Sequence, residues 1–309
     1  MKLPNPSSAE SIVSVANLSR RFSSKTVLDD LSLYVPKGCV FGLVGENGAG
    51  KTTLIKHILG ILRAETGTVR VFGLDPVGCP VRVLERIGYL SEQPDLPGWM
   101  RVDELIRYTQ AFYPNWDADY AEQMRRQFGL NSSARIKTLS KGQCAKAGLL
   151  IAQAHRPDLL LLDEPSSGLD PVVRKDILEA VIRTVADEGR TVFFSSHLLE
   201  EIERVSDYIA MIQRGRLVLF GSLDDIKAQY RRITLRFESP QAASPAIPGA
   251  LSIDGLGREW SVVCKGGRAE ISEIAAGLGA SIVEEAPLSL DEIFVAHAGA
   301  SSDEKPVFA

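Results

Sequence analysis

"CVFGLVGENGAGKTTLIKHILGIL", residues 39–62, is the stretch of this sequence that decides the fold. Residues 39–44 are almost all apolar, as in a strand that is buried on both faces of a parallel sheet. After Lys51 the apolar residues follow helical spacing, with Leu54, Ile58 and Leu62 on one face. The stretch therefore predicts an α/β fold in which a glycine loop joins a buried strand to a helix.

The glycine loop, residues 45–52, fits the pattern G-x-x-x-x-G-K-[ST]. Its glycines allow backbone N–H groups to fold inward around phosphates, and the following helix points its positive end at them. Lys51 is expected to neutralise the β- and γ-phosphates, and the Thr52 hydroxyl to coordinate Mg²⁺. The residues expected to contact the nucleotide are Gly45, Glu46, Asn47, Gly48, Ala49, Gly50, Lys51, Thr52 and Thr53.

Two carboxylates follow a second apolar run, LLLL at residues 159–162. Because ligands collect at the carboxyl ends of parallel strands, Asp163 and Glu164 are expected to lie beside the glycine loop. Asp163 suits the Mg²⁺ shell, which usually takes one or two carboxylates together with waters and phosphates. Glu164 is then free to polarise an attacking water. The alternative is that both are ordinary carboxylates at the end of a strand.

The overall composition argues against several other classes of protein. The net charge of the 309 residues is −4, which does not favour a nucleic-acid binder with a basic face. The apolar runs are much shorter than the roughly 20 residues of a membrane span, and the first residues do not resemble a signal peptide. We therefore expect a cytoplasmic protein that reaches a membrane only through a partner. The cysteines and histidines are not clustered at zinc spacing, so no metal site built from protein ligands alone is predicted.

The whole chain can be divided into parts by the secondary structure that each part is predicted to form. Residues 11–225 alternate strand-like and helix-like segments, typical of a parallel sheet with crossover helices. Within them, residues from about 94 to 155 form a predicted helical subdomain. Residues 226–299 predict a small α+β domain, and residues 1–10 and 300–309 are expected to be flexible tails. The predicted strands include 11–18 and 31–35 in the first part and 231–238, 260–266 and 281–288 in the second, with a loop at 239–252.

Five segments resemble the ATP-binding-cassette (ABC) ATPases in order and spacing over about residues 11–225: GENGAGKTT, YLSEQ, LSKGQ, LLLLDEPSSGLDP and FFSSH. The resemblance implies a P-loop NTPase core with a RecA-like parallel sheet, an antiparallel β-subdomain and a helical subdomain. It also implies that Gln93 contacts Mg²⁺ and senses the transport partner, and that His197 contacts the γ-phosphate. Phe22 matches the aromatic residue that stacks on adenine; the alternative is that it packs within its strand.

The resemblance also gives a role to LSKGQ, residues 139–143. In this family two cassettes dimerise head to tail, and this segment of one subunit closes over the ATP in the glycine loop of the other. Ser140, Gly142 and Gln143 are thus expected to contact a second subunit's ATP, and Asp170 to bridge to that subunit. Lys141 departs from the usual glycine, and its side chain is expected to point away. Because the glycine loop, Glu164, the LSKGQ segment and His197 are all intact, a homodimer with two competent sites is favoured over a heterodimer.

Two further segments resemble the ABC-2 branch of the family, AFYPNWD at 111–117 and PLSLDEIFVAHAG at 287–299. Its ATPase chains pair with a separate multi-helix membrane permease and commonly serve export, which implies a place at the inner face of the cell membrane. LPGWM, residues 96–100, would lie on the permease-facing surface, unless Trp99 is a core residue. The alternatives that remain are an importer subunit and a non-transport ABC ATPase acting in translation or DNA repair.

Overall fold

A computed structural model describes residues 11–186, 189–241, 243–266 and 268–300. The tail predicted at 1–10 lies outside these residues, as does the tail predicted at 300–309 except for its first residue, which ends a helix. The chain divides into two compact units, Met1–Phe220 and Gly221–Ala309.

The first unit is built on a six-stranded sheet with the strand order β5-β6-β7-β3-β8-β9. The neighbours from β5 to β8 pair in parallel, as the alternating sequence predicted. The central strands are buried along their whole length because helices cover the sheet. The strands are β5 Ile87–Leu90, β6 Leu159–Asp163, β7 Thr191–Ser196, β3 Val40–Val44, β8 Tyr208–Gln213 and β9 Arg216–Ser222.

A second, antiparallel sheet in this unit has the order β2-β1-β4, with β1 Ser11–Phe22, β2 Lys25–Pro36 and β4 Thr66–Val71. Both of its first strands are longer than the predicted 11–18 and 31–35. Asp29 and Asp30 interrupt the apolar pattern of β2, but each has a partner: Arg216 lies 2.7 Å from Asp29, and Asn17 donates to Asp30 at 2.9 Å. These tertiary contacts override the weak strand propensity of aspartate.

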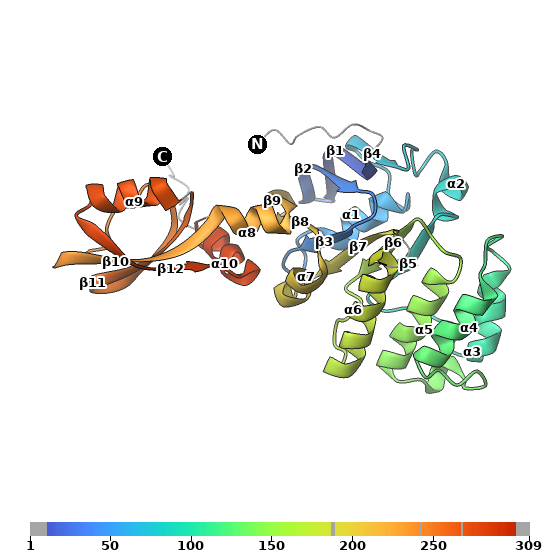
Figure 1. The fold of residues 1–309 in the computed structure, drawn as a ribbon. Helices are drawn as coiled ribbons and strands as arrows, with labels where there is room; N and C mark the ends of the chain where they lie inside the picture. Colours follow the sequence, from blue (N-terminus) through green and yellow to red (C-terminus); the bar gives the residue numbers. More distant parts are fainter. Residues whose placement is uncertain (1–10, 187–188, 242, 267, 301–309) are drawn as a thin grey trace. The chain divides into compact units, whose positions relative to one another are not determined.

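Helices complete the first unit. Figure 1 shows α3 (Val102–Gln110), α4 (Ala118–Gln127) and α5 (Lys141–Gln153) grouped together, away from the antiparallel sheet. The short 3-10 helix η1 (Ile136–Thr138) leads into α5. The other helices are α1 Lys51–Ile58, α2 Pro80–Leu84, α6 Pro171–Ala186 and α7 Leu199–Val205.

The second unit is a three-stranded antiparallel sheet with the order β11-β10-β12 and three helices. A small core of Ile233, Leu235, Phe237, Trp260 and Val262 lies on one face of β10 and β11. Its elements are α8 Leu223–Gln229, β10 Tyr230–Gln241, β11 Ala250–Lys265, α9 Arg268–Gly277, β12 Ala280–Pro287 and α10 Leu290–Ala300.

Two details of this unit differ from the sequence prediction. The expected boundary at residue 226 falls inside α8, because Ser222 caps that helix by accepting from the Asp225 N–H at 3.1 Å. The expected loop at 239–252 is shorter, since β10 continues to Gln241 and β11 already begins at Ala250. Among the helices of the described residues, none is both long and apolar enough to cross a bilayer.

Candidate nucleotide site

The candidate site lies at one edge of the six-stranded sheet. In the parallel register Val44 pairs with Ser196, and Asp163 pairs with Ser195. The carboxyl ends of β3, β6 and β7 therefore meet, and the three segments that follow them come together. Those segments are the glycine loop, the acidic pair and the turn that carries His197.

The glycine loop is shaped by close contacts that leave no room for a side chain. A Cβ on Gly45 would lie 2.4 Å from the carbonyl oxygen of Ile212. Gly50, with φ +111°, caps α1, and a Cβ there would lie 2.7 Å from Leu28 Cδ2. Gly48 also has a positive φ of +81°, but it faces open space. Backbone N–H groups are thus left at the surface of the loop, as phosphate binding requires.

Lys51 is the buried centre of the loop. Its Nζ donates to the carbonyl oxygens of Gly45 at 2.5 Å and Glu46 at 3.2 Å. The same ammonium lies 3.0 Å from Glu164 Oε1, where both side chains are almost fully buried. Lys51 is therefore held by the loop and by the carboxylate that follows β6.

Glu164 joins three parts of the site, although it is only 6% exposed. Its Oε2 accepts from His197 Nδ1 at 2.7 Å and from the His197 N–H at 3.3 Å. Its backbone has φ +49°, an uncommon conformation for a residue with a side chain. The Glu164 N–H donates to Ser195 Oγ at 3.0 Å, and this bond helps to hold the unusual backbone in place.

Asp163 lies one residue earlier and faces Thr52. Burial raises the pKa of the Asp163 carboxyl, while hydrogen bonds from Ser195 and Thr52 act in the opposite direction. The Ser195 hydroxyl donates to Asp163 Oδ1 at 2.8 Å. A carboxylate and a hydroxyl side by side are the oxygen ligands that Mg²⁺ prefers, so these residues fit that ion. Within the described ranges, no group of three or more His, Cys, Asp and Glu side chains could hold a metal without further ligands.

Gln93 and Phe22 lie at the margin of this arrangement. Gln93 is exposed on the loop after β5, and its backbone carbonyl accepts from Ser91 Oγ at 3.0 Å. Its neighbour Glu92 holds the loop by accepting from Ser167 Oγ at 3.2 Å. Phe22 ends β1 with 42% of its surface exposed, and the Arg20 guanidinium lies 4.7 Å from its ring centre. Phe22 is therefore not a core residue.

The segment 139–143 is not brought to Lys51 of its own chain. Figure 1 shows α5, which begins there, well apart from α1. Ser140 and Gln143 form a reciprocal cap: Ser140 Oγ accepts from the Gln143 N–H at 3.2 Å, and Gln143 Oε1 accepts from the Ser140 N–H at 3.0 Å. Both residues are exposed, whereas Gly142 packs against α6, where a Cβ would lie 2.9 Å from Val173. The start of α5 is thus ordered and open to a partner.

Lys141 and Asp170 lie at the contact of this helix with α6. The Lys141 Nζ lies 2.6 Å from the point where a Cβ on Gly168 would stand, so its side chain reaches the loop that follows Glu164. Asp170 Oδ1 accepts from the N–H groups of Val172 and Val173 at 3.1 Å each and so caps α6. Asp170 is exposed, which leaves its other oxygen accessible.

Sequence reasoning missed several side chains around the site. Ser195 bridges Asp163 and the Glu164 N–H; its position at the end of the strand beside 159–163 was a usable signal, because neighbouring parallel strands end at the same edge. Glu201 is a buried carboxylate that accepts from Ser166 and Ser196. It had no such signal, because glutamates in a helix usually face solvent.

A phosphate loop between a buried strand and a helix, with a carboxylate pair at the end of the next strand but one, defines a P-loop nucleotide-binding protein. The sequence pattern of the family described as ABC transporter matches residues 28–167. The chain belongs to the ATP-binding proteins of the ABC transporters, and it is an ATPase.

Two relatives illustrate the family. The ABC transporter ATP-binding protein YtrB of Bacillus subtilis (strain 168) is 29% identical over 93% of this chain and 98% of its own length. The bacitracin transport ATP-binding protein BcrA of Enterococcus faecalis is 31% identical, over 73% of this chain and 74% of its own length.

Solved structures agree with the fold. An ATP-binding subunit of an ABC transporter superposes with a TM-score of 0.64 at 30% identity, covering 70% of this chain and 92% of that one. A dimeric, post-hydrolysis ATP-binding cassette bound to ADP and phosphate gives a TM-score of 0.61 at 19% identity, covering 68% and 98%. The prediction of an ABC ATPase fold is thereby confirmed.

Proposed function

We propose that two copies of this chain form a head-to-tail dimer that hydrolyses ATP and drives a separate membrane permease, as the ATPase subunit of an ABC-2 type exporter. The observation that carries the proposal is a division of the site. Lys51, Glu164 and His197 gather at the sheet edge, whereas Ser140 stands exposed at the start of α5, with Gly142 packed against α6 beside it. Two half-sites on one chain become whole sites when a second copy supplies the missing half.

Each side chain then has a task set by its contacts. The glycine loop and Lys51 bind the phosphates, Phe22 stacks on the adenine, and Ser140 donates its hydroxyl to the partner's nucleotide. Glu164 orients the attacking water and takes its proton, with His197 holding the carboxylate at 2.7 Å. Thr52, Asp163 and Gln93 would hold Mg²⁺, which, when bound, neutralises phosphate charge. Lys51 must leave Glu164 when ATP binds, so phosphate binding and release of the carboxylate are linked.

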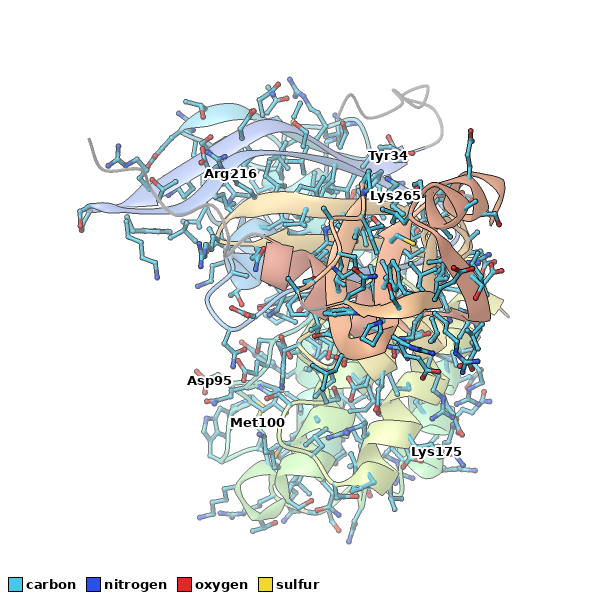
Figure 2. The ribbon with its side chains drawn as sticks, turned by 90° about the vertical axis from the view of Figure 1, so that its left-hand side faces the viewer. Tyr34, Asp95, Met100, Lys175, Arg216 and Lys265 are labelled. Carbon is cyan, nitrogen blue, oxygen red and sulfur yellow. The ribbon has the colours of Figure 1, made fainter. Side chains whose placement is uncertain are left out.

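An exposed aromatic group favours a permease as the partner. Trp99 is 70% exposed, which argues against its alternative reading as a core residue. Tyr108 and Phe112 are also exposed, and their ring centres lie 5.1 Å apart at the end of α3. Figure 2 shows Asp95 and Met100, which bracket the Trp99 segment, on the same side of the helical group. Exposed aromatic rings of this kind suit contact with a helix end of a membrane protein.

Transport direction rests on resemblance. The segments 111–117 and 287–299 are similar to exporter subunits, and BcrA is named for bacitracin transport. These favour export over import. The net charge of −4 argues against a nucleic-acid partner and supports a position at the inner face of the membrane, reached through the permease.

The test is a pull-down of the tagged Glu164→Gln chain from detergent-solubilised native membranes with ATP and Mg²⁺, followed by mass spectrometry. We expect a stoichiometric multi-helix membrane protein together with untagged copies of the chain. Recovery of ribosomal or DNA-repair proteins instead would refute the transport role.

A matched variant separates docking from hydrolysis. Trp99→Ala combined with Phe112→Ala should lose the permease but keep the ATPase rate of the purified chain within about twofold, because surface substitutions outside the site cost little. Equal recovery of the permease with this variant would place the docking surface elsewhere.

A further inference from the structure

A buried carboxylate of α7 lies outside the residues assigned so far. Glu201 is 5% exposed, and its Oε2 accepts from Ser166 Oγ at 2.5 Å and from Ser196 Oγ at 3.1 Å. Its Oε1 lies 3.1 Å from Arg174 Nε on α6, a helix that packs beside α7 (Figure 1). One side chain thus joins three separate segments of the chain.

The segments it joins are those that carry Glu164 and His197. Ser166 lies two residues after Glu164 and is itself buried. Ser196 directly precedes His197, and its hydroxyl also accepts from the Leu198 N–H at 3.0 Å. The Ser196 hydroxyl therefore fixes the backbone on both sides of His197, with its proton given to Glu201.

Burying this charge needs an explanation, because a buried ion pair is seldom more stable than apolar residues of the same size. A carboxylate adds a directional contact: a single oxygen accepts from the hydroxyl of Ser166, on the loop after β6, and from that of Ser196, at the end of β7, and fixes the distance between them. That distance sets how closely His197 approaches the Glu164 carboxylate, which is 2.7 Å from Nδ1 to Oε2.

We propose that Glu201 is a positioning residue of the ATPase, which holds the His197 turn against the Glu164 loop. The inference rests on the proposed roles of Glu164 and His197. Glu201 touches neither nucleotide nor water. It acts through Ser166 and Ser196, and the ion pair with Arg174 holds its other oxygen in place.

Glu201→Gln tests the proposal in the purified full-length chain with Mg²⁺ and ATP. The amide keeps the size of the side chain but loses the ion pair with Arg174 and one acceptor oxygen. We expect kcat to fall by about 10- to 100-fold, as for a misplaced catalytic group, with KM for ATP within about twofold of wild type. The matched control is Glu200→Gln, which removes the same charge from the exposed face of the same helix and should keep kcat within about twofold.

A double-mutant cycle separates positioning from general destabilisation. If Glu201 acts through His197, then Glu201→Gln should lower kcat by less than about twofold in a His197→Ala background. Should Glu201→Gln fail to fold, Ser166→Ala removes only one hydroxyl and should lower kcat by about 3- to 10-fold at unchanged KM.

Three results would overturn the inference. The first is a wild-type kcat in folded Glu201→Gln, and the second is a fall in ATP binding that matches the loss of rate. The third is a double mutant whose loss of kcat equals the product of the losses caused by Glu201→Gln and His197→Ala alone. Failure of the proposed function looks different. In that case His197→Ala and Glu164→Gln would themselves retain turnover.

Discussion

Replacing Glu164 by glutamine should stop turnover without removing ATP binding. The amide keeps the shape of the side chain but no longer takes a proton from water. Loss of a general base costs about 10²- to 10⁴-fold in kcat, or about 3 to 5 kcal/mol in activation free energy. ATP binding should persist because the glycine loop, Lys51 and Thr52 are unchanged.

The same substitution also weakens the contact between Glu164 and Lys51, and the size of that effect on stability follows from their distance. At 3.0 Å the attraction between the two charges is about 5 kcal/mol for an effective dielectric constant near 20, before the cost of burying them. That cost offsets most of the attraction, and the glutamine oxygen still accepts from Lys51. We therefore expect the nucleotide-free variant to lose about 1 to 3 kcal/mol of stability and to bind ATP as tightly as wild type or up to about tenfold more tightly.

The assay combines steady-state ATPase rates, equilibrium ATP binding and urea unfolding of the nucleotide-free chain, with Glu200→Gln as the control for loss of one negative charge. Turnover within tenfold of wild type in a folded Glu164→Gln chain would refute the role as base. ATP binding weakened in proportion to the rate would show instead that the carboxylate serves substrate binding.

Three further predictions concern single positions. Gly50→Ala should cost about 2 to 4 kcal/mol in urea unfolding, because its methyl would stand 2.7 Å from Leu28 at φ +111°; Gly48→Ala, in open space, should cost about 1 kcal/mol, and equal losses would refute the contact. Burial lowers the pKa of His155 to about 4, so the unfolded chain takes up a proton on this histidine at a higher pH than the folded chain does. The free energy of unfolding should therefore fall, by about 3 kcal/mol at most, as the pH drops from 6.5 toward 4. In pH-dependent melting, His155→Phe should lack this part of the slope. Because burial raises the pKa of Asp163, its charge opposes folding at neutral pH; Asp163→Asn should melt no lower than wild type without Mg²⁺ yet lose Mg²⁺-dependent turnover, and a lower melting temperature would contradict this sign.

Local patterns were sufficient to predict the parallel sheet and the centre of the site. The apolar runs at 39–44 and 159–162 predicted buried strands, and the residues that follow each of them meet at one edge. Such patterns work because a strand buried on both faces tolerates almost no polar residue, so its sequence is nearly determined by its position.

Features that depend on distant contacts were not predictable in this way. β2 begins at Lys25 because its aspartates find partners on other strands, and a single sequence does not show that pairing. Glu201 resembled a solvent-facing helix residue, since only the folded chain brings Ser166 and Ser196 to it. Lys141 was expected to point away, and its reach to Gly168 depends on the packing of α5 against α6.

The order of strands in the central sheet has a consequence for how the protein is made. β3 pairs with β7 and β8. During synthesis Val40 cannot form its strand pairing until Val192, about 150 residues further along the chain, has been made. At a synthesis rate of roughly 5 to 20 residues per second, the nascent strand stays without its neighbours for about 8 to 30 s. During that interval an apolar edge is exposed to aggregation and to chaperones. Slowed synthesis between residues 60 and 190 should therefore lower the yield of native protein, even though no folded contact changes.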